Sequence, residues 1–145
     1  MGWLETKVLE IHRIAGEYEV AVGQREDGQK AKTSSLRKEL RFALSGLVDK
    51  VAALPDVIGC FATRDGLLME GSGPIDGLEA AAAMAQWCIL PGKDAAETLQ
   101  LGKLSQLVII GEGGKLALIH VEGITIGVLA PTQVNLGELL TSLHD

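Results

Sequence analysis

Apolar residues gather in three short segments between Leu104 and Leu129, in the stretch LSQLVIIGEGGKLALIHVEGITIGVL, and glycine-rich links of a few residues separate them. Segments of this length and composition are typical of β-strands. Links this short can join only antiparallel neighbours, because a parallel return needs a dozen or more residues. A further hairpin is predicted over Val57–Glu70, where the turn pair Asp65-Gly66 separates two apolar runs. The pattern therefore predicts an antiparallel sheet.

One predicted strand is apolar on both of its faces. Along Lys115–Glu122, Leu116 and Leu118 point one way, and Ala117, Ile119 and Val121 point the other. A strand of this kind must be covered on both sides. At least one helix is therefore expected on each face of the sheet.

The first and last predicted helices each carry one apolar stripe. The first begins at Ser34 or Ser35, either of which can act as N-cap, and ends before Pro55. Gly46 inside it indicates a close approach to another backbone. Its stripe consists of Leu36, Leu40, Leu44, Leu47, Val51 and Leu54. The last helix is Leu136–Leu143, with Asn135 as N-cap and with Leu136, Leu139, Leu140 and Leu143 toward the core.

The alanine-rich helix between the two sets of strands is apolar around most of its girth. It begins at Leu78, and Asp76 with Glu79 forms a variant of the capping box. Small residues at Ala81, Ala85 and Cys88 give it a smooth side, and strongly polar residues on its outer side are nearly missing. Such a helix is buried on more than one side, so the second cover is expected from another subunit.

The end of that helix is predicted to be broken. Pro91-Gly92 interrupts it, because proline removes a backbone donor. Asp94 with Glu97 then caps a continuation over Ala95–Leu101, which Gly102 ends.

Residues 1–33 are expected to form an accessory arm and linker, and residues 34–145 the main domain. Helical spacing appears at Leu4, Val8, Ile11 and Ala15, whereas Tyr18, Val20 and Val22 alternate as in a strand. The polar stretch QREDGQKAKTSS carries the turn pair Asp27-Gly28 and is typical of a linker. Trp3 and Tyr18 could anchor a partner, although packing on the main domain is the simpler interpretation.

Composition excludes several classes of function. A net charge of −6 and an aromatic content of 3% disfavour nucleic acid as a partner, although Lys30–Arg41 is a basic cluster. The charged residues near the N-terminus are incompatible with a signal peptide, and no apolar run approaches the length of a membrane span. Cys60 and Cys88 are expected to be reduced core residues of a cytoplasmic protein.

Catalytic and metal-binding patterns are missing from the sequence, so we expect no enzyme, cofactor or metal site. His12, His120 and His144 have no spacing to a nucleophile, and His120 is expected to be satisfied in a strand. Gly111–Lys115 is followed by a strand, which indicates a hairpin turn and not a phosphate loop. Arg64, exposed at its turn with Asp65, is explained by turn chemistry more simply than by a role in catalysis or partner contact.

Four motifs together resemble the roadblock (dynein light chain) superfamily, in particular its bacterial and archaeal regulators of small GTPases. They are GCFATRDGLL at 59–68, LEAAAA at 78–83, LGKLSQLVIIG at 101–111 followed by GKLAL, and VNLGELL at 134–140. The resemblance spans about Ser35–Asp145. It implies a profilin-like α/β/α sandwich of α+β class with a five-stranded antiparallel sheet, in the order helix-β-β-helix-β-β-β-helix.

The resemblance also implies a function. Proteins of this family form homodimers through the alanine-rich helix and the edge strand, and they bind Ras-like small GTPases as regulators, including GTPase activators, or as scaffolds. The positions expected at the dimer or partner interface are Leu78, Ala81, Ala82, Ala85, Cys88, Gln106, Leu107, Val108, Ile109 and Ile110. The alternative is a profilin-like or sensor-like domain that binds a small ligand in a cavity beneath Met84 and Trp87.

Overall fold

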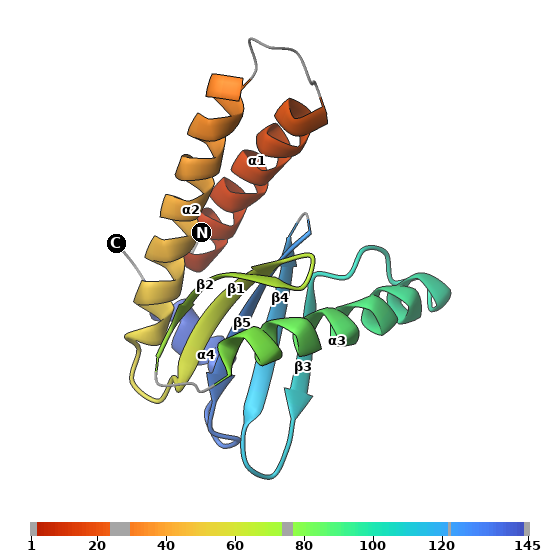
Figure 1. The fold of residues 1–145 in the computed structure, drawn as a ribbon. Coiled ribbons are helices and arrows are strands. Elements are labelled where there is room, and N and C mark those ends of the chain that lie inside the picture. Colours follow the sequence, from red (N-terminus) through yellow and green to blue (C-terminus); the bar gives the residue numbers. More distant parts are fainter. Residues whose placement is uncertain (1–2, 24–29, 74–76, 122, 144–145) are drawn as a thin grey trace.

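The computed structural model describes residues 3–23, 30–73, 77–121 and 123–143. Figure 1 shows the helices and strands in chain order. They are α1 (Trp3–Gly23), α2 (Lys30–Ala52), β1 (Gly59–Arg64), β2 (Leu67–Ser72), α3 (Leu78–Thr98), β3 (Gln106–Ile110), β4 (Lys115–Val121), β5 (Ile124–Ala130) and α4 (Leu136–Thr141). From α2 onward the predicted α+β order is confirmed.

The five strands form one antiparallel sheet in the order β2-β1-β5-β4-β3. β1 and β5 pair at its centre, with Phe61 opposite Gly127. A Cβ atom at Gly127 would lie 2.3 Å from Cζ of Phe61, so only glycine leaves room for this buried ring. β2 and β3 are the two edges of the sheet.

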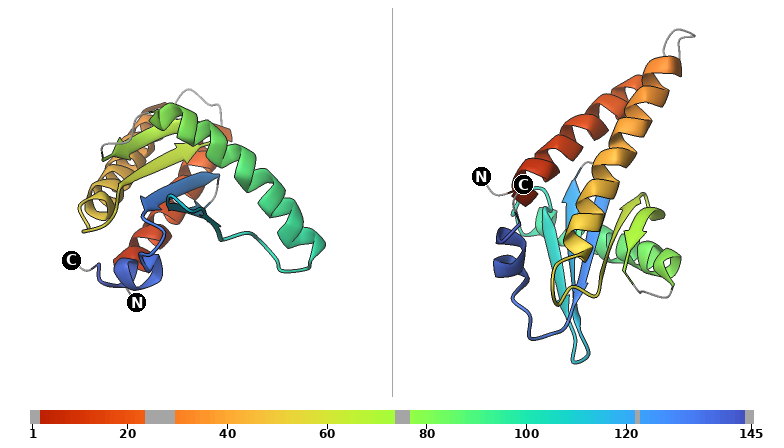
Figure 2. Two further views of the ribbon diagram at one scale, coloured as in Figure 1. Left: turned by 90° about the horizontal axis from the view of Figure 1, so that it is seen from below. Right: turned by 90° about the vertical axis from the view of Figure 1, so that its left-hand side faces the viewer.

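Helices cover both faces of the sheet, as the apolar pattern of β4 predicts. α3 crosses one face, and α1, α2 and α4 lie on the other (Figures 1 and 2). Under α3, Leu118 packs in a small core with Phe61, Ala85 and Ile89. Ala117 of the same strand faces the larger core, which α1, α2 and α4 share with the opposite face. The sheet is therefore the middle layer of a sandwich.

Within the N-terminal arm, Trp3–Gly23 is one helix, so the strand suggested by Tyr18, Val20 and Val22 is wrong. A lone strand would leave its backbone unpaired, whereas helix α1 buries Ile11 and Ile14 in the larger core. Trp3 is only 8% exposed, with Lys50 Nζ 4.5 Å from the centroid of its ring. Packing on the main domain is therefore confirmed as the role of Trp3.

Helix α2 begins at Lys30, which overturns two predictions. The polar stretch from Lys30 is helical and is not a linker, and Ser34 and Ser35 lie inside the helix and do not cap it. The turn pair Asp27-Gly28 lies outside the described residues. The boundary expected between residues 33 and 34 falls within α2.

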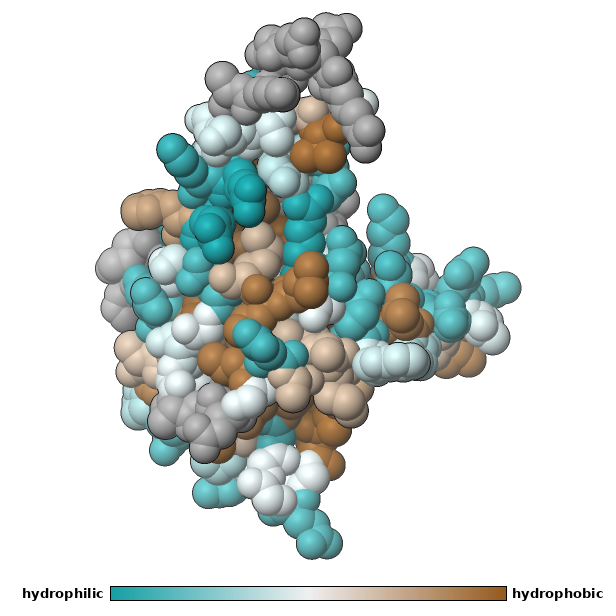
Figure 3. Space-filling model, in the orientation of Figure 1, coloured by the Kyte–Doolittle hydropathy of each residue, from teal (hydrophilic) through white to brown (hydrophobic). Residues whose placement is uncertain are grey.

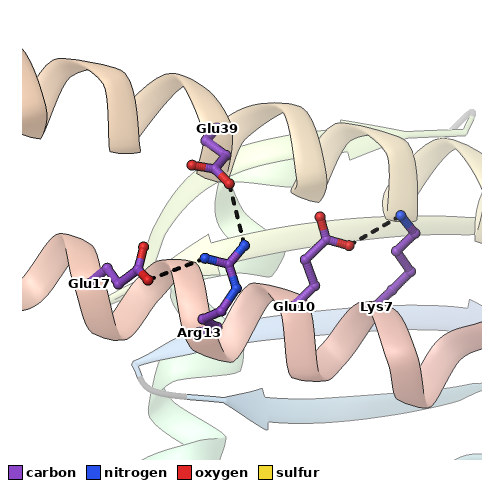
Figure 4. Close-up of polar contacts among 5 residues, drawn as sticks. All are labelled: Lys7, Glu10, Arg13, Glu17 and Glu39. Atoms are coloured by element: carbon purple, nitrogen blue, oxygen red, sulfur yellow. Dashed lines mark hydrogen bonds and ion pairs between the residues drawn. The ribbon is translucent and has the colours of Figure 1, made fainter.

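Ion pairs line the side where α1 and α2 meet (Figure 4). Arg13 bridges the two helices, with Nη1 3.2 Å from Oε1 of Glu17 and Nη2 3.4 Å from Oε1 of Glu39. The charge of Glu17 is the main cause that raises the pKa of Arg13 above its ordinary value. Lys7 Nζ lies 3.2 Å from Oε2 of Glu10 within α1. Exposed pairs of this kind stabilise a fold weakly, so the apolar contacts fix the position of α1.

The stripe predicted for α2 is confirmed, but the role of its glycine is wrong. The core-facing positions Leu40, Leu44, Leu47 and Val51 are at most 1% exposed. Gly46 is exposed, and a Cβ atom placed on it would meet nothing within 4 Å. No close backbone approach therefore explains this glycine.

Two predictions on α3 are also corrected. Its N-cap is Gly77, with φ 75° and no side-chain cap; Asp76 lies outside the described residues. Pro91 lies inside a continuous helix and does not end it. Because Pro91 is on the exposed side, the Trp87 carbonyl that loses its helical partner can be satisfied by water.

The C-terminus of α3 and the N-terminus of α4 are capped in different ways. α3 ends in a Schellman motif: the Leu101 N–H donates to the Ala96 carbonyl at 2.8 Å, and Gln100, with φ 57°, occupies the left-handed position expected for Gly102. The Asn135 side chain accepts a hydrogen bond from the Glu138 N–H at 3.1 Å, which confirms the cap of α4.

Candidate partner-binding surface

The outward side of α3 is apolar over three turns. Between Glu79 and Lys93 every residue of α3 that is exposed is apolar. These residues are Ala80, Ala83, Met84, Trp87, Leu90 and Pro91, and we call them the outer face of α3. Met84, Trp87 and Leu90 are 61%, 73% and 49% exposed. Figure 3 views this side, where tan, brown and pale atoms cover the middle of α3 and teal atoms appear at its projecting end.

The side chains that the sequence assigns to the interface lie instead on the inner side of α3. Ala82 and Ala85 are 0% and 1% exposed, buried by the protein's own sheet. Leu78, Ala81 and Cys88 are half-buried and pack on the core around Phe61. The small residues thus let α3 approach its own sheet closely, and Ala82 and Ala85 are fully covered within the protomer. The outer face of α3 takes their place as the candidate surface.

Among the described residues, the space beneath Met84 and Trp87 is occupied by core side chains. Both side chains point outward, and the space between α3 and the sheet is filled by Phe61, Ile89 and Leu118. The ligand site expected at this place is therefore wrong.

The strand β3 is the open edge of the sheet on the side toward which α3 extends. Among the described strands it pairs with β4 alone, in a register fixed at both ends by hydrogen bonds beyond the strand. The Ser105 carbonyl accepts a hydrogen bond from the His120 N–H at 3.0 Å, and the Gly111 N–H donates to the Gly114 carbonyl at 2.8 Å. In an antiparallel ladder, hydrogen-bonded and non-hydrogen-bonded pairs alternate.

That alternation decides which backbone groups of β3 are open. The N–H groups of Leu107 and Ile109 point toward β4, and those of Gln106, Val108 and Ile110 point away from the sheet. The side chains of Val108, Ile109 and Ile110 are 44%, 42% and 65% exposed. An apolar edge with open donors is a template for another strand. The five residues Gln106–Ile110, which are expected at an interface from the sequence, thus lie together on the open edge strand β3.

The outer face of α3 and the edge of β3 are neighbours. A Cβ atom at Gly92 would lie 3.2 Å from Cδ2 of Leu104 and 3.7 Å from Cδ2 of Leu107, so α3 crosses the sheet edge at Gly92. Beyond this point the helix projects past the sheet (Figures 1 and 2). A second chain that paired with β3 would therefore lie next to α3 near Gly92, where the outer face ends.

Two side chains considered for a chemical role, His120 and Arg64, have structural partners. The Nδ1 atom of His120 lies 3.1 Å from Oγ1 of Thr125, which confirms that His120 is satisfied within the sheet. Arg64 is not exposed at its turn as predicted: it pairs with Glu19, and its guanidinium lies 4.5 Å from the Tyr18 ring centroid. His144 lies outside the described residues. Burial raises the pKa of Cys60 to about 12, with a smaller contribution from the charge of Asp49.

Two further findings concern the described residues as a whole. They contain no group of three or more His, Cys, Asp or Glu side chains that could hold a metal ion. None of the described helices has both the length and the apolar character that a bilayer crossing requires.

Comparison with protein-family models gave no match, and comparison with curated proteins gave none. Among solved structures, the chain is similar to a roadblock/LC7 domain from Streptomyces avermitilis, at 24% identity and a TM-score of 0.58 over 69% of this chain and 84% of that chain. It is similar to Myxococcus xanthus MglB at 14% identity and a TM-score of 0.60, over 67% and 81% of the two chains. It is also similar to an MglB structure with a tetrameric arrangement, at 12% identity and a TM-score of 0.59, over 65% and 74%.

These likenesses agree with the element order and the strand order of the sheet. The resemblance that the sequence motifs indicate is therefore confirmed at the level of the fold, and the chain has the fold of the roadblock superfamily.

Proposed function

We propose that this protein is a homodimer that binds a Ras-like small GTPase and regulates it or scaffolds it, without an enzymatic reaction of its own. The observation that carries the proposal is the outer face of α3, which is free of charged side chains for three turns and ends near Gly92, where α3 crosses the open edge of β3. Apolar patches of this kind on soluble proteins mark interaction sites.

A second copy of the chain is the partner that best fits this surface. An edge strand that pairs with its twin satisfies the open donors of Gln106, Val108 and Ile110 in both copies. The same two-fold axis brings the outer faces of the two α3 helices together, so Trp87 and Leu90 are covered in each copy. One symmetric contact would thus cover both the unpaired edge of β3 and the exposed apolar face of α3.

The proposed partner class rests on the fold. Roadblock proteins, which this chain resembles, bind Ras-like small GTPases, and one of the similar MglB structures has a tetrameric arrangement. We propose that the joined sheets and α3 helices form the platform on which the GTPase docks, in the cytoplasm. Regulation would act on the GTPase's own catalytic residues, with GTPase activation as one form of it.

Two measurements test the proposal in order. Light scattering at micromolar concentration should give twice the chain mass of 15.3 kDa, and a particle of the single mass would contradict the dimer. The immobilised protein should then retain a Ras-like GTPase from native cytosol, and the purified GTPase should rebind with different affinities in its GDP and GTP states. If none of the purified small GTPases rebinds, the proposed partner class is contradicted.

A further inference from the structure

An open cavity of about 880 Å³ lies away from the outer face of α3, between α1 and the end of α3. Four parts of the chain line it: one turn of α1, the last turns of α3, the loop that leads to β3, and the end of β4 with Gly123 of the turn that follows. The His120 N–H donates to the Ser105 carbonyl at 3.0 Å, which fixes the loop against β4. Its volume is within the range of sites for small organic ligands.

The lining combines an apolar wall with basic groups. Val8 and Leu9 of α1 line the cavity together with Leu104 and Val121, and apolar atoms make up most of its surface. The titratable residues among its described lining are His12, Lys93, Glu97, Lys103 and His120, of which only Glu97 is acidic. This local excess of basic groups stands out in a chain whose net charge is −6.

The same lining selects against several ligand classes. It contains no Phe, Tyr or Trp among its described residues, so it offers no ring on which a nucleobase could stack. A purely apolar ligand would make no electrostatic contact with Lys93 and Lys103. A small inorganic anion would leave the apolar lining of the cavity exposed to water. The ligand that satisfies both parts has an aliphatic body and one anionic group.

We propose that this cavity binds a small amphipathic anion, in which an aliphatic chain lies between α1 and Leu104 and a carboxylate or phosphate group lies among the lysines. This site lies apart from the outer face of α3, although its lining loop leads directly into β3. Because α1 supplies one wall and the end of α3 another, an occupied site would tie the N-terminal arm to the helix that carries the proposed interface.

The test uses the full chain and four probes: octanoate, octyl phosphate, 1-octanol and inorganic phosphate. Binding is followed by backbone amide shifts in NMR and by calorimetry. We expect saturable binding of octanoate or octyl phosphate, with shifts at His12 and Ser105, and at least about tenfold weaker binding of 1-octanol. The stronger of the first two probes identifies the anionic group as carboxylate or phosphate.

Variants assign the binding to the cavity. The double variant Lys93→Gln, Lys103→Gln should raise the dissociation constant of the tighter-binding probe by at least about tenfold, because two charge-assisted contacts are lost. Both lysines are exposed, so the fold should be unaffected. The charge-matched control replaces two exposed lysines of α2, Lys32→Gln with Lys38→Gln, and should bind as wild type does. The proposal is overturned by the absence of saturable binding, by equal binding of 1-octanol, by binding of inorganic phosphate alone, or by equal affinity in the double variant and the control.

Discussion

Replacing Trp87 by alanine should dissociate the proposed dimer without unfolding the protomer. Trp87 is 73% exposed at the centre of the outer face of α3, so its side chain contributes little to the core of one protomer. Aromatic side chains bury roughly 150–250 Å² when fully covered, and a large aromatic at the centre of an interface commonly dominates its energy.

The magnitude follows from the exposed area. With 73% of Trp87 open to solvent, about 110–180 Å² is there to be covered, which at about 25 cal/mol per Å² corresponds to roughly 3–4 kcal/mol for complete coverage. If half of that area is covered in each copy, the symmetric dimer loses about 3 kcal/mol, because the substitution acts twice. The dissociation constant should then rise by roughly a hundredfold.

Sedimentation equilibrium over a range of concentrations measures this change, and circular dichroism checks the fold. Phe42→Ala is the matched control, because Phe42 is also an exposed aromatic, at 84%, but lies on α2 away from the outer face of α3. We expect weaker association for Trp87→Ala, wild-type association for Phe42→Ala, and unchanged melting of the protomer in both. An unchanged dissociation constant for Trp87→Ala would refute the reasoning.

Three other predictions concern the core. Gly127→Ala should lower the free energy of unfolding by about 1–3 kcal/mol in urea titrations, because the added methyl group meets the Phe61 ring, and Phe61→Leu should restore part of the loss. Trp3→Ala should cost about 3–5 kcal/mol in the same assay if α1 is an integral part of the core, and a change below about 1 kcal/mol would show that the arm is dispensable. Burial raises the pKa of Cys60 from its ordinary 9.0 to about 12, so its neutral thiol contributes stability that is complete below 9.0 and is lost as the pH rises toward about 12. Native protein should therefore react with a thiol reagent at half-buried Cys88 alone, and equal reaction of both cysteines before unfolding would contradict the burial of Cys60.

The sheet could be predicted from sequence because its signals are local. Short glycine-rich links between apolar segments permit only antiparallel pairing, and the double-sided pattern of Leu118 and its neighbours requires cover on both faces. The cap at Asn135 is likewise a short-range signal, and the structure places it as expected.

The orientation of α3 could not be predicted from its sequence. A helix that is apolar nearly all round has no polar side to fix which face meets the sheet, so Ala82 and Ala85 could equally have faced a partner. The structure buries both, with Ala85 in the core around Phe61, and turns Trp87 outward, because small side chains allow the closer packing on the sheet. The requirement for a second covering surface follows from the sequence, but the residues that present it do not.

Tertiary contacts explain the errors in the N-terminal arm. The polar stretch from Lys30 has no apolar periodicity, yet it is helical because α1 runs beside α2. The alternation at Tyr18 mimics a strand, but Tyr18 serves to cover Arg64 from within a helix. The cavity between α1 and the end of α3 joins segments far apart in sequence, so no local signal indicates it.

Amide hydrogen exchange along β3 tests the central claim most directly. In the wild-type protein at concentrations above the dissociation constant of the dimer, the amides of Gln106, Val108 and Ile110 should be protected from exchange, because they donate hydrogen bonds to the second copy. In Trp87→Ala at low concentration they should exchange rapidly, while Leu107 and Ile109 stay protected by β4. Rapid exchange of the three outward amides in the wild-type protein at high concentration would contradict the proposed dimer.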